Sequence, residues 1–307
     1  MARDRTAVAA VDVGGTAAKA VLLDQDLRVL ARAHQPTERT GPGAVAEQVG
    51  RLVEELAGRA GTDPVGIGVV VPGIVDDQAG VARYSANLGW RDVPFAALLR
   101  GRLDLPVAFG HDVTACGLAE WELGAGRGHR TVAVVPVGTG IAAALLLDGR
   151  PYRAGGYAGE LGHVDIGHDL RCGCGATGCL EAVASAAALT RRYRERAGRP
   201  AHAADAAEVV RSAWAGDPHA AAVLADAVDG LARGLRLLTM LLAPEVVVLG
   251  GGLFEAGATL LDAVRDRLAE LVTFQPMPRL RLAELGAEAG CLGAGLLAWR
   301  AVAGESP

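Results

Sequence analysis

Aromatic side chains and lysine are scarce in this sequence of 307 residues. Aromatic residues make up 4% of it, and of its 30 basic residues only Lys19 is not arginine. The net charge is −5, so the chain lacks the basic excess typical of proteins that coat nucleic acids. Long apolar runs are also missing, because prolines, glycines and a glutamate interrupt the stretches 131–147 and 235–249. These absences argue against membrane-spanning helices and against a nucleic-acid partner.

The residues that are plentiful indicate a folded chain. Hydrophobic residues account for 51% and glycine for 42 positions, which is too apolar a composition for an intrinsically disordered protein. A chain of this length can bury a large core, so we expect one large domain or two lobes. The first apolar run, 6–11, ends at Asp12 and is too short for a secretory signal. We therefore expect a cytoplasmic protein.

The first half of the chain has the pattern of a strand-rich α/β unit. Apolar runs at 6–13, 19–23 and 27–33 predict a meander of three strands. The elements expected next are a helix, a strand, a helix, a strand and a helix, at 43–58, 65–71, 94–102, 107–110 and 112–123. Between them, the residues around Trp90 are expected to form a loop.

The second half begins in the same way, which indicates a duplication. Residues 13–24 placed over 137–148 give 7 identities in 12 positions. Later strands and helices are expected at 184–196, 206–214, 218–242, 246–249, 253–271, 280–282 and 289–301. We therefore expect an α/β protein with duplicated βββαβαβα halves. These would form two lobes around a cleft, 1–120 and 121–307, and the last helix has room to pack back on the first lobe.

The first glycine turn has the composition of a phosphate-binding loop. Asp12 ends a strand, and Gly14 and Gly15 behind it let backbone amides approach a phosphate closely. Thr16 adds a hydroxyl donor, and the compact ammonium of Lys19 suits a phosphate group. The spacing is neither that of a Walker A loop nor that of a Rossmann fingerprint. Taken alone, the turn is equally well a plain hairpin.

Two further glycine turns favour nucleotide binding. Gly138-Thr139-Gly140 repeats the first glycine turn in the second half of the chain. Gly250-Gly251-Gly252 follows an apolar strand and opens a helix, where backbone amides can meet a phosphate. Three such turns, each after an apolar strand, make a nucleotide the better interpretation.

Three cysteines within eight positions form the pattern of a metal site. Cys172, Cys174 and Cys179 are separated by glycines that let the loop wrap around one ion. Thiolates in this number favour tetrahedral zinc, which needs a fourth ligand. His168 is near enough in sequence to supply it. The alternative is three reduced thiols without a metal.

The motifs together resemble those of the ROK family (repressor, open reading frame, kinase), which contains sugar kinases. Residues 12–19 look like its first phosphate motif and 138–140 like its second. Five more stretches stand in the family's order along essentially the whole chain: Pro-Gly-Ile-Val-Asp at 72–76, Asn-Leu-Gly-Trp at 87–90, His111-Asp112, Gly-Glu-Leu-Gly-His at 159–163, and the cysteine-rich run at 172–181. The resemblance implies the actin-like, hexokinase-type ATPase fold.

The resemblance also implies residue roles. Asp112 matches the catalytic aspartate, which accepts the proton of the hydroxyl that is phosphorylated, although by itself it reads equally well as a helix N-cap. The sugar-binding residues implied are Asn87, His111, Asp112, Glu160, His163 and Glu181. Asp12 would face Mg²⁺ on ATP through water, and Lys19 would neutralise phosphate charge. His163 becomes the fourth zinc ligand, with His168 as the alternative, and the zinc would be structural.

The sequence departs from the family pattern at two places. His111 stands where the family has asparagine, so a bulkier ring replaces an amide next to the catalytic aspartate. Ala142, Ala143 and Ala144 stand where glycines often follow the second phosphate loop. Both changes bear on which acceptor fits.

The function expected is ATP-dependent phosphorylation of a primary hydroxyl of a hexose, with glucose as the first choice. The alternatives are a kinase for another hexose-like polyol (a cyclitol, an N-acetylhexosamine or fructose) and a sugar sensor without turnover. A DNA-binding repressor is disfavoured, because eleven residues before Asp12 leave no room for a helix-turn-helix domain. The resemblance implies a homodimer, and the sequence does not decide whether polyphosphate can replace ATP.

Overall fold

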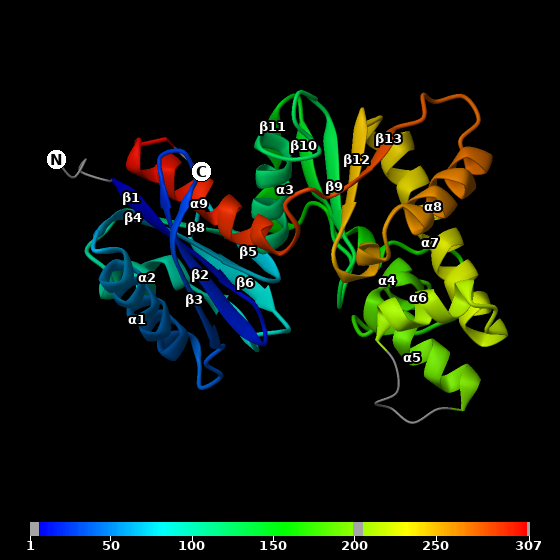
Figure 1. Cartoon of the computed structure of the whole chain (residues 1–307), viewed down its shortest axis with the longest axis horizontal. Helices are drawn as coiled ribbons and strands as arrows, with labels where there is room; N and C mark the ends of the chain where they lie inside the picture. Colours follow the sequence, from blue (N-terminus) through cyan, green and yellow to red (C-terminus); the bar gives the residue numbers. More distant parts are fainter. Residues whose placement is uncertain (1–5, 199–204, 306–307) are drawn as a thin grey trace. The chain divides into compact units, whose positions relative to one another are not determined.

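The computed structural model describes residues 6–198 and 205–305, which form two compact units (Figure 1). Unit 1 contains 6–119 together with 153–158 and 287–305. Unit 2 contains the described residues of 120–152 and 159–286. A short segment and the last helix of the second half of the chain therefore belong to unit 1.

A five-stranded mixed sheet forms the centre of unit 1. Its strands are β1 (Ala7–Val13), β2 (Ala17–Asp24), β3 (Val29–Pro36), β4 (Pro64–Val71) and β8 (Val107–His111), in the order β3-β2-β1-β4-β8. The first three strands pair antiparallel, and β1, β4 and β8 are parallel. Short β-branched runs bounded by glycine and proline favour such strands, and nearly every residue of β1 and β4 is buried. Asp12 near the end of β1 and His111 at the end of β8 consequently lie at the same edge of the sheet, with β4 between their strands.

Helices cover both faces of this sheet (Figure 1). On one side, α1 (Pro42–Ala60) and α2 (Phe95–Arg102) bury apolar residues against the strands. On the other side, α9 (Ala289–Val302) packs on β1, β4 and β8. Its close approach requires glycine, because a Cβ on Gly68 would clash with the backbone of Ala294. The start of α3 (Asp112–Glu122) reaches α9 at Gly293 in the same way.

Unit 2 repeats the sheet of unit 1. Its strands are β9 (Val132–Pro136), β10 (Ala144–Leu147), β11 (Arg150–Tyr152), β12 (Val246–Gly250) and β13 (Arg279–Leu282), in the equivalent order β11-β10-β9-β12-β13. Its α-helices are α4 (Leu180–Ala184), α5 (Ala186–Ala197), α6 (Ala206–Trp214), α7 (Pro218–Leu242) and α8 (Ala258–Leu271). The long helix α7 packs against each of the other four. The equivalent strand order confirms the duplication inferred from the repeated glycine turn.

The segment expected as a loop around Trp90 is instead a small antiparallel sheet, so that expectation was wrong. It contains β5 (Ile74–Asp76), β6 (Val81–Ser85) and β7 (Trp90–Val93). Strands of three to five residues are too short to show a clear alternation in the sequence. The turn between β6 and β7 carries Asn87.

One predicted helix is interrupted and another starts later than predicted. The residues from 253 to 271 form a 3₁₀ turn, Gly252–Ala256, and then α8, with Gly257 between them at φ 84°. The helix predicted over 184–196 is α5, which starts at Ala186, after Ser185, whose hydroxyl accepts the N–H of Ala188 and caps it. Both differences arise at residues that leave the helical conformation locally.

A buried carboxylate ties the end of α3 to two loops of unit 2. Glu120 is 1% exposed, and its oxygens accept the N–H groups of Ala125 at 3.0 Å, Glu284 at 3.2 Å and Leu285 at 2.8 Å. Such bonds compensate a buried charge. Within the described ranges, the structure contains no helix with the length and apolar character needed to cross a bilayer.

Candidate functional site

Asp12 lies at the end of β1, where the sheet brings it between two other strands. It pairs with Lys19 of β2 and with Val70 of β4. Its carboxylate lies against the first turn of α9, because a side chain on Gly290 would clash with Oδ2. The sequence could not show this contact, since Asp12 and Gly290 are far apart in the chain.

Burial and a second carboxylate raise the pKa of Asp12 to about 6. The larger cause is loss of water around the carboxylate, followed by the negative charge of Asp112, and the ammonium of Lys19 offsets part of the increase. Burial and the carboxylate of Asp12 raise the pKa of the Cys291 thiol to about 12. A cation near Asp12 would favour its ionised form, which agrees with a role facing a metal-nucleotide.

The turn after Asp12 is held by the chain that follows β3. The N–H of Gly14 donates to Ala17 O at 2.9 Å, and the hydroxyl of Thr37 donates to Gly14 O at 2.6 Å. The guanidinium of Arg39 donates to Gly15 O at 2.8 Å. These bonds fix the backbone of the turn, and Arg39 adds a positive charge that sequence reasoning missed.

Asn87 lies against this same turn. A Cβ built on Gly15 would be 2.9 Å from the Cβ of Asn87, so only glycine fits there. The structure thereby brings a predicted sugar-site residue together with the first predicted phosphate turn. Thr16 is exposed at the tip of that turn.

Lys19 is exposed on the α9 side of the sheet. It is directly opposite Asp12 on β1 and His34 on β3, so all three side chains share one face. Lys19 lines a pocket of about 480 Å³ in unit 1. Arg32, His34 and Arg59 also line it, as do Glu288 and Cys291 near the start of α9. Lys19 thus borders a partly apolar pocket whose charged residues are mostly basic, and it lies opposite Asp12.

Asp112 begins α3 immediately after β8. Its Oδ1 accepts the N–H of Val113 at 2.7 Å, whereas an N-cap aspartate accepts an N–H two or three residues further on. The same Oδ1 lies 3.0 Å from Nε2 of His111, and Nδ1 of that ring lies 3.2 Å from Oγ1 of Thr114. His111 is 15% and Asp112 27% exposed. The carboxylate is therefore held in place while part of it remains accessible.

The second and third glycine turns lie side by side in unit 2. Val137, just before Gly138, donates its N–H to Gly250 O at 2.8 Å and accepts the N–H of Leu253 at 3.1 Å. A Cβ on Gly251, which has φ 80°, would clash with the backbone of Val137. The predicted nucleotide turns 138–140 and 250–252 are thus brought together by β9 and β12.

Glu181 supports the second turn rather than standing apart from it. Its Oε2 accepts the N–H of Ile141 at 3.0 Å, and a Cβ on Gly140 would lie 2.5 Å from that oxygen. Thr139 lines a pocket of about 430 Å³ with residues from α5, among them Ala186 and Thr190. Glu181, which was predicted to bind the sugar, therefore forms a hydrogen bond through Oε2 to the backbone next to a predicted nucleotide-binding turn.

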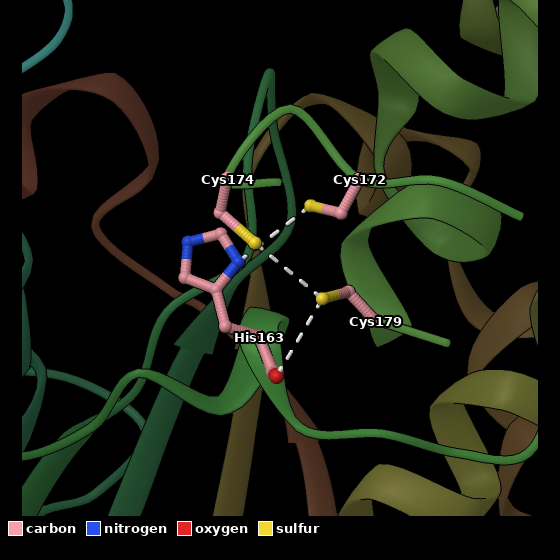
Figure 2. Close-up of side chains that lie close together, drawn as sticks. All are labelled: His163, Cys172, Cys174 and Cys179. Atoms are coloured by element: carbon pink, nitrogen blue, oxygen red, sulfur yellow. Dashed lines mark hydrogen bonds between the residues drawn. The ribbon is translucent and has the colours of Figure 1, made fainter. Parts of the chain in front are cut away.

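The thiol cluster is assembled as predicted (Figure 2). His163, Cys172, Cys174 and Cys179 present one ligand atom each, and these atoms all lie within 4.8 Å of one another. The sulfurs of Cys174 and Cys179 are 3.7 Å apart, and Nδ1 of His163 is 3.7 Å from the sulfur of Cys172. Tetrahedral zinc with Zn–S bonds of about 2.3 Å separates its sulfurs by about 3.8 Å, so the donor set fits this metal.

Of the two candidate histidines, His163 lies in the cluster and His168 does not. Both nitrogens of His168 face the backbone: Nδ1 accepts the N–H of Leu170 at 3.0 Å, and Nε2 lies 3.0 Å from Cys179 O. His163 directs Nδ1 at the thiols and Nε2 at Glu160, whose carboxylate is 3.9 Å away. A carboxylate behind a histidine is the usual arrangement around zinc ligands.

The thiols have unequal proton affinities. Burial and the neighbouring thiols of Cys174 and Cys172 raise the pKa of Cys179 to about 12. The N–H of Ala176, above all, holds the pKa of Cys174 below its usual value. A bound cation would favour the thiolate form of each cysteine.

The fold and these turns define an actin-like ATPase of the hexokinase type, and comparison with known proteins narrows this further. The model of the ROK family matches residues 8–301, so the chain belongs to the ROK family. A glucokinase of Streptomyces coelicolor is 32% identical over 94% of this chain and 96% of its own.

Two solved structures are similar over nearly the whole chain. A ROK hexokinase from Thermus thermophilus has a TM-score of 0.85 and 36% identity, over 97% of this chain and 100% of that one. A ROK family glucokinase from Streptomyces griseus, in complex with glucose and AMPPNP, has a TM-score of 0.84 and 28% identity, over 96% and 99%.

Several residues around the candidate site escaped sequence reasoning. Arg39 follows β3 in a stretch with no recognisable motif, so nothing in the sequence signalled its contact with Gly15. Thr114 carried a signal, because a residue three positions after His111 faces it across the first turn of a helix. The ion pair of Asp77 and Arg153, at 2.8 Å, joins segments distant in the chain and required the tertiary structure.

Proposed function

We propose that this protein is an ATP-dependent glucokinase that transfers the γ-phosphoryl group of ATP to a primary hydroxyl of glucose. Membership of the ROK family supports the reaction, and relatives named as glucokinases over most of both chains support the acceptor. The observation that carries the proposal is Asp112. Its carboxylate is fixed at the end of β8, in the same unit as Asp12 and the first glycine turn.

In this proposal Asp112 accepts the proton of the acceptor hydroxyl as the oxygen attacks phosphorus. Magnesium-bound ATP supplies the electrophilic phosphoryl group and neutralises the charge of the transfer. Asp12 would hold the metal through water, and Lys19 would lie near phosphate. The turn amides that are not used internally, such as those after Gly14 and Gly138, would donate to phosphate oxygens.

Sugar hydroxyls would be recognised by a small set of polar residues. Asn87 is favoured by its position against the first turn, and Glu160 by its place beside the thiol cluster. His163 would meet the sugar only through Nε2, since Nδ1 faces the thiols. Glu181 would use its remaining oxygen, because Oε2 is bound to Ile141 N–H.

We also propose structural Zn²⁺ bound by His163, Cys172, Cys174 and Cys179. The fit of the sulfur separation to a tetrahedral site supports this assignment. The bound ion would stabilise the loop and would orient Glu160 through His163. Such a thiol site implies a reducing compartment, which supports a cytoplasmic location.

The test of the main proposal is an ADP-release assay with ATP and Mg²⁺ on zinc-loaded protein. The acceptors are glucose, mannose, fructose, N-acetylhexosamines and cyclitols, and polyphosphate replaces ATP in a parallel series. Glucose should give the highest kcat/KM. Turnover with another acceptor alone would replace glucose by that acceptor, and His111 is the residue that favours this second candidate. Silence with every acceptor, together with retained sugar binding, would make the protein a sensor.

A homodimer is proposed from the resemblance and from exposed apolar side chains on unit 2. Leu241 at the end of α7 is 77% exposed and Phe274 after α8 is 82% exposed. Exposed apolar side chains mark a subunit contact only where they form a continuous patch, and the variant below tests this for Leu241. Light scattering should give twice the chain mass of 31.4 kDa, and a Leu241→Glu variant should shift the value toward the monomer.

A further inference from the structure

The imidazole of His111 is held at both of its nitrogens. His111 ends β8, and Asp112 and Thr114 lie in the first turn of α3, so the three side chains come from one tight bend between two elements. Nε2 lies 3.0 Å from Oδ1 of Asp112, and Nδ1 lies 3.2 Å from Oγ1 of Thr114. The ring is 15% exposed. Its orientation is therefore determined by two polar contacts rather than by packing alone.

These contacts determine where the proton of a neutral ring must lie. An ionised carboxylate only accepts hydrogen bonds, so Nε2 must carry the proton that faces Oδ1. Nδ1 is then an acceptor, and the hydroxyl of Thr114 donates to it. The result is a chain of donors that runs from Thr114 through His111 to Asp112.

The same oxygen of Asp112 has a second neighbour. Oδ1 accepts the N–H of Val113 at 2.7 Å and lies 3.0 Å from Nε2 of His111. A proton on Nε2 would place a second donor beside this oxygen and would restrict the rotation of the carboxylate. Oδ2 would then be the oxygen left for an acceptor hydroxyl.

The other charged groups next to the ring compensate each other. The pocket beside His111 is lined by Asp77 and Arg153, which form an ion pair at 2.8 Å with side chains 10% and 19% exposed. Asp12 also acts on Asp112, from β1, which β4 separates from β8. The charge that His111 itself contacts is therefore that of Asp112.

We propose that His111 is a positioning residue for Asp112. As a neutral ring anchored by Thr114, it donates from Nε2 to Oδ1 and so presents Oδ2 to the hydroxyl that is phosphorylated. This proposal rests on the proposed role of Asp112 as the base. Asparagine, the residue of the family pattern, is shorter than histidine and would not span Thr114 and Asp112 together.

The first experiment reads the proton position without using activity. Histidine labelled with ¹⁵N is observed by long-range ¹H–¹⁵N correlation, well above the usual titration range of histidine, and a His111→Gln variant assigns the signal. A neutral ring with its proton on Nε2 supports the proposal. A proton on Nδ1 with bare Nε2, or a doubly protonated ring, overturns it.

The second experiment separates positioning from folding. His111→Ala should lower kcat roughly 10- to 100-fold, with the KM for ATP and the melting temperature nearly unchanged, because misplacement of a reacting group has costs of this size. His111→Gln, which can donate to Oδ1, should recover part of kcat. Thr114→Val should lower kcat less, and Thr114→Ser should restore it.

The control is His219→Ala at the exposed start of α7, which should leave kcat unchanged. Equal kcat values for His111→Ala and the parent protein would overturn the positioning role. Silence of the parent protein with every sugar would instead contradict the proposed function, and the ¹⁵N experiment would still test the proton position. The two failures are therefore distinguishable.

Discussion

The two glycine turns that open the sheets of units 1 and 2 stand at equivalent places but differ in backbone bonding and in chemistry: Gly14 N–H donates to Ala17 O, whereas Gly138 N–H donates to Gly140 O. When residues 13–24 are placed over 137–148, Asp12 corresponds to Pro136 and Lys19 to Ala143. The first turn is braced by Thr37 and by a guanidinium, whereas the second is braced by the carboxylate of Glu181. Each half of the chain thus opens with a glycine turn after its first strand, while only the first turn carries the ionisable pair Asp12 and Lys19 at its base.

This contrast predicts that carboxylates in unit 1 decide turnover, with Asp112 giving the largest effect. Asp112→Asn should lower kcat by roughly 10²- to 10⁴-fold, because an amide cannot accept the proton of the sugar hydroxyl. Sugar binding, measured by calorimetry, should be largely retained. Asp104→Asn, at an exposed position before β8, is the matched control. Equal loss of binding and turnover would contradict the assignment of the base.

Replacing one cysteine of the proposed zinc site tests whether the metal stabilises unit 2. Cys174→Ser should release zinc and destabilise the loop around it, since metal binding contributes directly to folding. Metal content by mass spectrometry and the melting temperature by calorimetry are the measurements. Cys116→Ser, outside the cluster, should keep the metal. Unchanged metal content in Cys174→Ser would mean that the proposed ligand set is wrong.

Asp12 links stability to pH in a direction that can be predicted. Its pKa is raised from 3.8 to about 6 in the folded state, so the folded state binds the proton more tightly than the unfolded one. Stability from this group is present below the unfolded pKa and is lost as pH rises toward 6. Asp12→Asn should therefore increase the free energy of unfolding by about 1–2 kcal/mol above this window.

The same variant should lose activity, because it lacks the carboxylate proposed to face the metal. Denaturant unfolding across the pH range, with the parent protein alongside, measures the difference in stability. The two curves should converge at acidic pH, where Asp12 is protonated in both states of the parent. A constant difference at every pH would show that the gain does not come from ionisation.

Glycine-to-alanine substitutions in the two turns should have the smallest effects, and they compare the two turns directly. Gly15→Ala should push on Asn87 and raise the KM for sugar, whereas Gly140→Ala should displace Glu181 and raise the KM for ATP. Each cost should be about 1–2 kcal/mol, or roughly tenfold. Gly128→Ala would be a poor control because its φ is 84°, so Gly58→Ala, inside α1 with open space around it, is preferable. Identical kinetic changes in both variants would remove the proposed division between the turns.

Much of the fold was accessible from local patterns. Short apolar runs, several of them ended by glycine, predicted most strands of the two large sheets, because buried strands require such runs, whereas β11 was not predicted. The strands β5, β6 and β7 were missed, since they are too short for an alternation and are stabilised by contacts such as the stacking of Trp90 on Phe95 at 4.7 Å. The start of α5 was predicted two residues too early, because the capping role of Ser185 depends on the local backbone.

The residues of the candidate site likewise fall into those that the sequence could predict and those that required the structure. The glycine turns, the thiols and Asp112 could be found from residue type and spacing, because phosphate contact, zinc binding and proton transfer each need particular groups. The choice between His163 and His168 could not be made from spacing. It depended on which ring nitrogens the backbone occupies, and Leu170 and Cys179 occupy both of those of His168.

By itself, the sequence determined which chemical groups the protein has and which local turns present them, since these follow from residue type and near-neighbour spacing. The tertiary structure alone decided which groups act on one another. Strand register places Asp12 beside Lys19 and near Asp112, and β9 and β12 bring the turns 138–140 and 250–252 together. Electrostatic and hydrogen-bond effects fall off steeply with distance, so the raised pKa of Asp12 and the orientation of His111 arise only in the folded chain.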